Sequence, residues 1–357
     1  MTGALGLVGS AVIDELVAEG RQVVATDLET PRNRKKARRL EGSRQVEVRW
    51  ADLTQAGAAD ALMTGVHPGA VVHLAAVIPP LCYAHRGLAR AVNVDATLSL
   101  VRAASSVSSP PRFVLASSVA VYGPRNPHRR SDLLTAATPV RPCDLYGGHK
   151  VEAERAVTSS GLDWVILRLG GVLTPAPQPE AGLDMVYFEG LLPADGRLQT
   201  VDVRDVARAF VGSTGTDATS EVFLVGGDAS HRVVQGAIGS AMAGALGLAN
   251  VLPPGRPGDP DSDSNWFATD WMDTARAQEV LSFQGHSLPD LFEEAGTEVG
   301  WLRWPLKAAS PAVRTYLRAR SPYRHQAGQF ADPWGAIRRN WGDPSPDSPA
   351  PDGTPKR

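Results

Sequence analysis

Hydrophobic positions follow two different periods through the first two thirds of the chain. Short apolar runs of strand length occur at 22–27, 46–53, 69–77, 112–123, 163–173 and 221–227. Helix-length stretches with apolar residues three or four positions apart lie between them, notably after Gly9 and at 88–106 and 144–161. This alternation predicts βαβ units, and therefore an α/β fold with a doubly wound parallel sheet.

The pattern loosens after residue 174, where a Pro-rich loop follows the last long apolar run. We expect residues 1–174 to form the main sheet domain and 175–300 to form a small lobe interleaved with the last strands. Residues 301–342 form a basic, aromatic extension, and the Pro, Asp and Ser content of 343–357 is typical of a disordered tail.

Composition and charge narrow the function classes. The chain has 357 residues, of which 43% are hydrophobic and 21% charged, as in ordinary globular proteins. A formal net charge of −2 argues against a nucleic-acid partner. The two cysteines, Cys82 and Cys143, form neither a disulfide framework nor a metal-ligand spacing, so we expect a cytoplasmic protein without a metal site.

A glycine-rich turn opens the chain. Gly3, Gly6 and Gly9 precede a helical pattern, and the strand at 22–27 ends in Asp27. Such a turn lets a pyrophosphate approach the backbone at a helix N-terminus, and the acid can accept hydrogen bonds from a ribose. The carboxylate favours NAD, whereas the arginines of 31–39 favour NADP more weakly.

Tyr146 and Lys150 share one face of the helix expected at 144–161. A nearby ammonium stabilises a phenolate, so we expect Lys150 to lower the pKa of Tyr146 and make it an acid–base catalyst. Ser118 ends the strand at 112–118 and could bind the same substrate oxygen. Its neighbour Ser117 points to the opposite face of that strand, so only one of the two can reach the site.

The order of these motifs resembles the extended short-chain dehydrogenases/reductases of the NAD-dependent epimerase/dehydratase group, over about residues 2–300. The resemblance implies a Rossmann-type sheet, a homodimer, a small-molecule substrate, and Ser118, Tyr146 and Lys150 as catalytic residues. The implied cofactor residues are Gly3, Gly6, Leu7, Gly9, Asp27, Asp52, Leu53, Leu74, Ala75, Ala76, Asn93, Tyr146 and Lys150. The candidates for substrate binding are Ser118, Val119, Arg168 and Gly171, although Arg168 could equally be an anchor at the end of its strand.

The implied activity is NAD-dependent hydride transfer at a secondary alcohol or ketone carbon. Two departures weaken a nucleotide-sugar substrate: Gly171 replaces an Asn that touches the diphosphate in 4-epimerases, and Leu198 replaces an Arg. A smaller alcohol, ketone or sugar acid is an alternative to a nucleotide-sugar 4-epimerase or dehydratase. A non-catalytic NAD(H)-binding sensor or scaffold is a further alternative, against which the intact catalytic residues argue.

The resemblance also places a buried strand directly before the glycine turn, and the chain has none there. We expect the natural protein to begin some residues upstream, because otherwise the centre of the sheet would be empty.

Three other residues could be mistaken for catalytic groups. We expect His73 to pack beside the cofactor, His149 to face away from the site, and Cys82 to be a neutral loop residue.

The segment 301–325 carries six Lys or Arg and no acid, with Trp301, Trp304 and Tyr316 interleaved. A helix beginning at Ser310-Pro311 could lie on a membrane surface or pack on protein. We expect the second, with the aromatic side chains buried.

Overall fold

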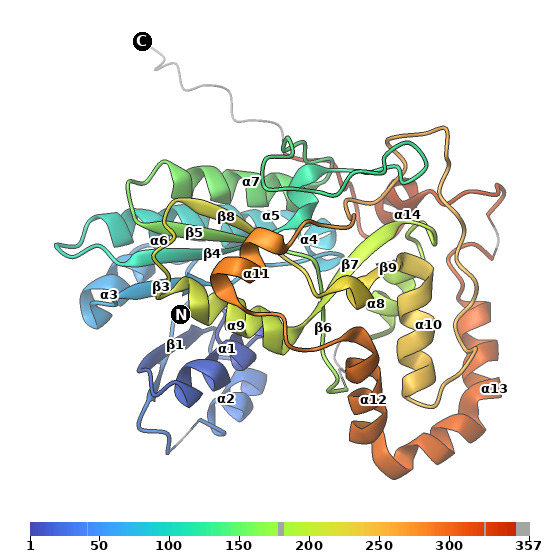
Figure 1. Cartoon of the computed structure of the whole chain (residues 1–357), viewed down its shortest axis with the longest axis horizontal. Helices are drawn as coiled ribbons and strands as arrows, with labels where there is room; N and C mark the ends of the chain where they lie inside the picture. The colour runs from blue at the N-terminus through green and yellow to red at the C-terminus, as the bar shows by residue number, and fades with distance from the viewer. Residues whose placement is uncertain (41, 178–181, 325, 348–357) are drawn as a thin grey trace.

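The computed structural model describes residues 1–40, 42–177, 182–324 and 326–347, which form a parallel sheet between two layers of helices with a lobe at one side (Figure 1). The strands are β1 (Val23–Asp27), β2 (Val46–Trp50), β3 (Ala70–His73), β4 (Arg112–Ser118), β5 (Trp164–Leu169), β6 (Gly171–Leu173), β7 (Arg197–Asp202), β8 (Glu221–Val225) and β9 (Arg232–Val234). Strands β1 and β2 pair with each other, and β3, β4, β5 and β8 pair in that order, all in parallel. The predicted α/β class is confirmed.

Helices cover both faces of the sheet. The α-helices of this part are α1 (Leu7–Ala18), α2 (Pro31–Ala37), α3 (Ala58–Val66), α4 (Leu81–Ala84), α5 (Arg86–Arg90), α6 (Ala96–Ser105), α7 (Leu145–Thr158), α9 (Val203–Ser213) and α11 (Ala275–Leu281). A π-helical turn (Ala91–Asp95) joins α5 to α6, and a 3-10 turn (Val119–Tyr122) follows β4. The single helix expected at 88–106 is therefore a helix with a π-turn inside it.

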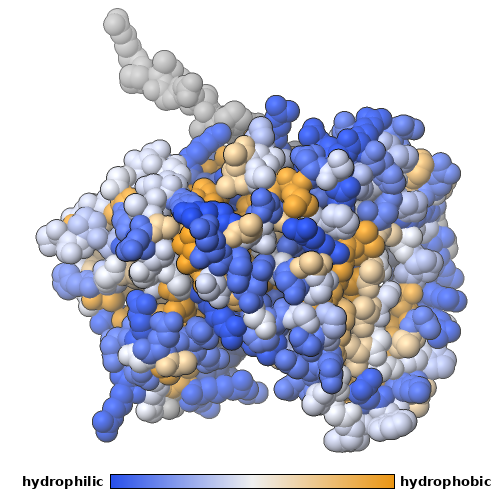
Figure 2. Space-filling view, viewed as in Figure 1, coloured by the Kyte–Doolittle hydropathy of each residue, from blue (hydrophilic) through white to orange (hydrophobic). Residues whose placement is uncertain are grey.

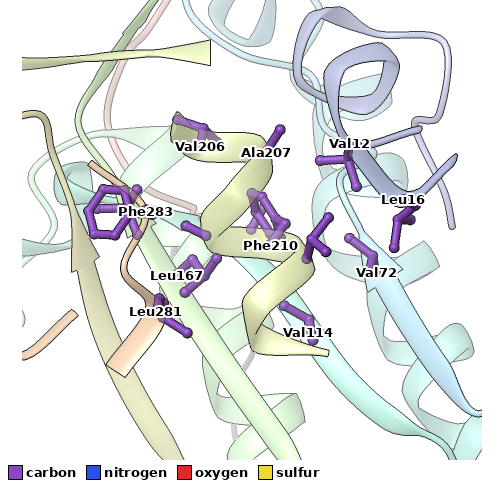
Figure 3. Packing of buried hydrophobic residues seen from close by; sticks show 14 of the residues in the cluster. Val12, Leu16, Val72, Val114, Leu167, Val206, Ala207, Phe210, Leu281 and Phe283 are labelled. Carbon is purple, nitrogen blue, oxygen red and sulfur yellow. The ribbon is translucent and has the colours of Figure 1, made fainter. Parts of the chain in front are cut away.

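Alternate residues of the strands fill the two cores. Val114 of β4 packs with Val12 of α1 and Phe210 of α9 (Figure 3). Its neighbour Leu115 faces the other side and packs in the cluster of α3, α6 and α7. Because both faces are buried, the strands read as continuous apolar runs in the sequence, as parallel strands do.

The sheet is almost divided between β1 and β3. Among the described residues, only Met1 and Thr2 lie between them: Thr2 N donates to Val72 O at 3.0 Å, and Thr26 N donates to Met1 O at 2.8 Å. Beyond Met1 the two strands border a groove of about 700 Å³, lined by Met1 and strand valines together with polar residues at its rim such as Arg21, Arg44 and Glu47. Burial lowers the pKa of the Met1 amine, which donates to Val24 O, to about 6.

An apolar extension joined before Met1 should fill this groove as a parallel strand. Adding Val-Ile-Val-Val should raise the free energy of unfolding by on the order of 2 kcal/mol, because about 2 kcal/mol per buried Val or Ile exceeds the cost of ordering each residue. Urea denaturation of the extended and unextended proteins measures the difference. A Gly-Ser-Gly-Ser extension is the matched control, and equal stability of all three proteins would contradict this account of the groove.

The lobe contains a three-stranded sheet in the order β6, β7, β9, and four further helices. These are α8 (Gly182–Glu189), α10 (Gln235–Ala245), α12 (Leu288–Val299) and α13 (Arg303–Ala319), with 3-10 turns at Ala229–His231 and Gly300–Leu302. The remaining helix, α14 (Pro333–Asn340), lies close to the main domain. Apolar residues reach the surface over the part of the lobe that carries α10 and β9 (Figure 2).

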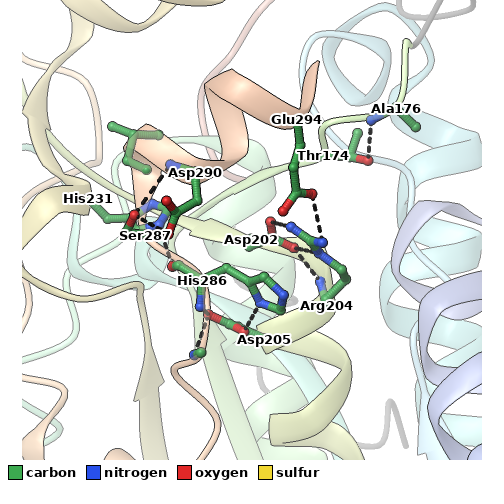
Figure 4. Close-up of polar contacts among 12 residues, drawn as sticks. Thr174, Ala176, Asp202, Arg204, Asp205, His231, His286, Ser287, Asp290 and Glu294 are labelled. Carbon is green, nitrogen blue, oxygen red and sulfur yellow. Dashed lines mark hydrogen bonds and ion pairs between the residues drawn. The ribbon is translucent and has the colours of Figure 1, made fainter. Parts of the chain in front are cut away.

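Polar contacts fix the lobe to α9, at the end of β7 (Figure 4). Asp202 caps α9 and binds Arg204, whose guanidinium also reaches Glu294 of α12 at 2.8 Å. Asp205 accepts a hydrogen bond from His286 Nδ1 at 2.6 Å and from two backbone N–H groups of the same loop. The lobe is therefore held to the main domain by buried carboxylates rather than by apolar packing alone.

Helix α13 differs from the expectation in two ways. It begins at Arg303, so that Pro311 lies inside it rather than at its start. The side chains of Trp301 and Trp304 are 75% and 74% exposed, and Tyr316 is 43% exposed, so the expected burial of these aromatics is wrong. Leu306, Val313 and Leu317 are half-buried instead, spaced as one helix face. Among the described residues, no helix is long and apolar enough to cross a membrane.

Candidate active site

The glycine turn between Thr2 and α1 is built for close backbone approach. Gly3 has a φ of +64°, and a Cβ there would lie 2.7 Å from Ala75 N. A Cβ on Gly9 would lie 2.3 Å from Gly3 O. Helix α1 has no side-chain cap at Gly6, so its first N–H groups remain available to a ligand. The turn therefore fits a pyrophosphate at the N-terminus of α1.

Asp27 lies at the carboxyl end of β1, beside this turn. Its carboxylate accepts hydrogen bonds from Leu5 N at 2.8 Å and from Asn33 Nδ2 at 3.1 Å. Oδ1 accepts two N–H groups, because Leu28 N also donates to it at 2.8 Å, but Oδ2 accepts only from Leu5 N among the described residues, so Asp27 can still accept a ribose hydroxyl there. Lys36 donates to Leu5 O at 2.8 Å and thereby places one cation of the basic run beside the turn.

Asp27→Ala should weaken NAD binding about tenfold, since a charge-assisted hydrogen bond contributes roughly 1.5–3 kcal/mol. The same change should relax discrimination against NADP, because the carboxylate that repels a 2′-phosphate is gone while Lys36 stays. Fluorescence titration with NAD and NADP measures both affinities. Tighter NADP than NAD binding by the unmodified protein would show that Asp27 does not set the preference.

The other predicted cofactor residues lie at the same edge of the sheet. Asp52 and Leu53 follow β2, and Leu74, Ala75 and Ala76 follow β3. Asn93 lies in the π-turn and holds this second segment in place: its side chain accepts from Val77 N at 2.7 Å and donates to Val77 O at 2.9 Å. Asn93 is thus tied to the loop that borders the glycine turn.

The three predicted catalytic residues meet at the end of β4 and the start of α7. The Lys150 ammonium donates to Ala116 O at 2.8 Å and lies 5.6 Å from the centroid of the Tyr146 ring. Ser118 Oγ accepts from Ala120 N at 3.2 Å, and the Ser118 side chain lies close enough to Tyr146 to favour a lower pKa of that phenol. Asp144 caps α7 by accepting from Tyr146 N and Gly147 N, and so fixes the start of the helix that carries both residues.

The electrostatics differ from the sequence expectation. Burial raises the pKa of Tyr146 above its ordinary value, as do Cys82 and Asp144, while the nearby Ser118 side chain acts in the opposite direction. Burial also lowers the pKa of Lys150 to about 8, although Glu154 acts against it. The expected net lowering of the Tyr146 pKa is therefore wrong for this structure, because burial raises that pKa.

Arg168 and Ser117 belong to a buried network behind the catalytic residues. Arg168 makes two hydrogen bonds to Glu154, at 2.9 and 2.6 Å, and one to Tyr122 at 2.7 Å. Ser117 donates to the same Glu154 at 2.5 Å, on the strand face opposite Ser118. Sequence reasoning missed Glu154, although it follows Lys150 by four residues on the same helix face. These contacts favour the alternative in which Arg168 is an anchor.

The remaining candidates differ in their surroundings. Val119 is buried directly after Ser118, and Gly171 lies in β6 against Leu198. His73 bonds to the Thr2 and Thr97 hydroxyls, and burial, followed by Lys150 and the N-terminus, lowers its pKa to about 3, so it is neutral. His149 contacts Asp347 rather than the catalytic residues. Burial raises the pKa of the Cys82 thiol, so this residue is neutral as well.

Comparison with known proteins agrees with this geometry. The NAD dependent epimerase/dehydratase family matches residues 1–226. UDP-glucose 4-epimerase of Mycolicibacterium smegmatis is 28% identical over 309 residues, which is 80% of this chain and 92% of that protein. The structure of MoeE5 in complex with UDP-glucuronic acid and NAD is 26% identical, with a TM-score of 0.65 over 85% of this chain and 98% of that one. The UDP-glucuronic acid 4-epimerase of Bacillus cereus, in complex with UDP-glucuronic acid and NAD, has a TM-score of 0.66 at 20% identity, covering 84% and 98%.

The chain therefore belongs to the NAD-dependent epimerase/dehydratase family, and the predicted family and enzyme class are confirmed. NAD is the cofactor of this family, in agreement with the sequence expectation. The homodimer and the individual roles of the site residues stay predictions.

Proposed function

We propose that this enzyme transfers hydride between NAD and a secondary alcohol or ketone carbon of a sugar-class substrate. The convergence of Ser118, Tyr146 and Lys150 beside the glycine turn carries the proposal. Gly3, Gly9 and Asp27 would hold the dinucleotide, and NAD when bound supplies the hydride acceptor and a positive charge.

The protein's own residues would move the proton. Ser118 binds the substrate oxygen and orients it toward Tyr146. Tyr146 removes the hydroxyl proton in the oxidative direction and returns it in the reductive direction. The Lys150 ammonium is held in place by its hydrogen bond to Ala116 O. It thereby keeps a positive charge on the face of α7 that carries Tyr146, where a phenolate would form.

Two local features support a substrate without a diphosphate. Leu198, at the position where the sequence lacks the expected Arg, is buried with Ile238 and Leu288. Arg197, its neighbour, stacks on Trp271 and pairs with the buried Asp270 at 3.7 Å. Leu198 offers no cation, and the Arg197 guanidinium is already held between Trp271 and Asp270, although its buried Nη1 lacks a hydrogen-bond partner among the described residues.

A nucleotide-sugar 4-epimerase is the second candidate. The Mycolicibacterium smegmatis relative is a UDP-glucose 4-epimerase and the Bacillus cereus structure is a UDP-glucuronic acid 4-epimerase, which favours this candidate. In that case the hydride returns to the same carbon, so no net NADH accumulates.

One assay separates the two candidates. The protein is incubated with NAD and either UDP-glucose, UDP-glucuronic acid or a panel of free sugars and sugar acids, while NADH absorbance and proton NMR are recorded. NADH formation with a free sugar or sugar acid supports the first candidate. A 4-epimer without NADH supports the second. No turnover of any of these compounds, with NAD bound, would point to the sensor alternative.

A further inference from the structure

A segment outside the family match lies across the site. Residues 326–347, which we call the strap, include α14 and follow α13. In Figure 1 the strap runs from the lobe, past α14, to the start of α7. The solved relatives match 98% of their own chains but only 84–85% of this one, so this chain carries segments that they lack.

The first part of the strap contacts residues of the lobe. The Arg256 guanidinium donates to Gln326 O at 2.5 Å and to Ala327 O at 3.3 Å. Trp334 stacks on Phe267 with ring centroids 5.3 Å apart and donates to Ser264 O. These contacts set the direction in which the strap leaves the lobe.

The middle of the strap seals an apolar cluster that includes the Tyr146 ring. Ala336 and Ile337 of α14 are fully buried in this cluster together with Cys82 of α4. Trp341 closes it with edge contacts to Tyr187 and Phe188, at centroid distances of 5.9 and 5.7 Å. The strap therefore covers the side of the catalytic helix on which Tyr146 packs.

The end of the strap fastens to the main domain. Leu145 N, at the first residue of α7, donates to Pro344 O at 2.7 Å. Asp347 pairs with Arg86 at 2.7 Å, with Arg90 at 3.2 Å and with His149 at 3.0 Å. Residues 343–347, assigned to a disordered tail on composition, thus make defined contacts, and the rest of that tail lies outside the described residues.

We propose that the strap is a closing and positioning element of the active site: the Asp347 clasp holds Pro344 against α7, and this fixes the helix start that carries Tyr146. The closing role of the strap does not depend on the proposed function. Its effect on turnover does, because turnover can be measured only if the proposed reaction is correct. An N–H at the start of a helix has no partner within the helix, so a carbonyl supplied from elsewhere decides how firmly the first turn is held. Asp347 is a positioning residue here, since it reaches Tyr146 only through Pro344 and α7.

The first test measures, without any substrate, how well the strap shields the residues beneath it. In a Cys143→Ser background, Cys82 is the remaining thiol, and it is fully buried beneath the strap. Asp347→Asn should increase the rate of Cys82 labelling by Ellman's reagent about tenfold, because loosening the clasp raises the population of the open form. Asp343→Asn is the matched control, since among the described residues its carboxylate contacts only Arg338 and Ser345, both within the strap.

Hydrogen exchange provides the second readout. Exchange of the Leu145 amide should accelerate by a similar factor in Asp347→Asn and in a chain ending at Arg324, and stay unchanged in Asp343→Asn. If the shortened chain does not fold, Asp347→Asn alone decides the question. Unchanged rates of Cys82 labelling and of Leu145 amide exchange in Asp347→Asn would refute the closing role of the strap, whether or not the proposed reaction is found.

Turnover tests the positioning role. With a substrate from the assay above, Asp347→Asn should lower kcat several-fold and leave the KM for NAD unchanged, and Asp347→Glu should restore part of kcat. An unchanged kcat in a variant with faster Cys82 labelling would leave the strap as a cover and refute its positioning role.

Discussion

Replacing Tyr146 by Phe should lower kcat about 10²–10⁴-fold, the usual contribution of a positioned acid–base group. The ring and its packing against the apolar cluster remain, so NAD affinity should stay within about twofold. The measurement is steady-state turnover with a substrate found in the assay described above, together with NAD titration.

Tyr122→Phe is the control for this experiment. Tyr122 is also a buried phenol, but its hydroxyl contacts Arg168 and Thr135 O. We expect its activity to stay within a few-fold of the unmodified protein. A Tyr146→Phe enzyme of similar activity would remove Tyr146 from the mechanism.

Arg168→Met should lower the free energy of unfolding by about 3–5 kcal/mol, because it leaves the Glu154 carboxylate buried and uncompensated. The side chains of Arg168 and Glu154 are only 6% and 9% exposed. Urea denaturation measures the loss.

The double change Arg168→Met, Glu154→Met should recover most of that stability, since replacing both members of a buried pair by apolar groups is often nearly neutral. An Arg168→Met protein of normal stability but raised substrate KM would instead identify Arg168 as a substrate ligand.

The elements that sequence predicted well are those determined by local pattern. Gly3 and Gly9 stand where a side chain would collide with backbone, so their spacing alone indicates the turn. The α7 helix follows from its apolar period and from Asp144, a strong N-cap residue, directly before it. Tyr146 and Lys150 meet because helix geometry brings residues four apart together.

The failures have long-range causes. No local signal pairs Asp347 with Arg86, 261 residues away in the chain. The burial that raises the pKa of Tyr146 is produced partly by strap residues and is not visible in the helix sequence. In α13, Pro311 suggested a helix start, but the helix continues through it, and Ser310 Oγ donates to Leu306 O within the preceding turn.

The groove between β1 and β3 has a practical consequence for handling the protein. The Met1 amine points to Val24 O inside this groove, so residues fused before Met1 enter it before they reach solvent. A hydrophilic affinity tag would have to place polar groups beside the strand valines that line this groove, or would pull Met1 and Thr2 away from their neighbours, directly before Gly3 of the cofactor turn. Purification tags are therefore better placed at the carboxyl terminus. If an amino-terminally tagged protein does not bind the cofactor, the tag should be tested as the cause before the loss is attributed to the protein's own residues.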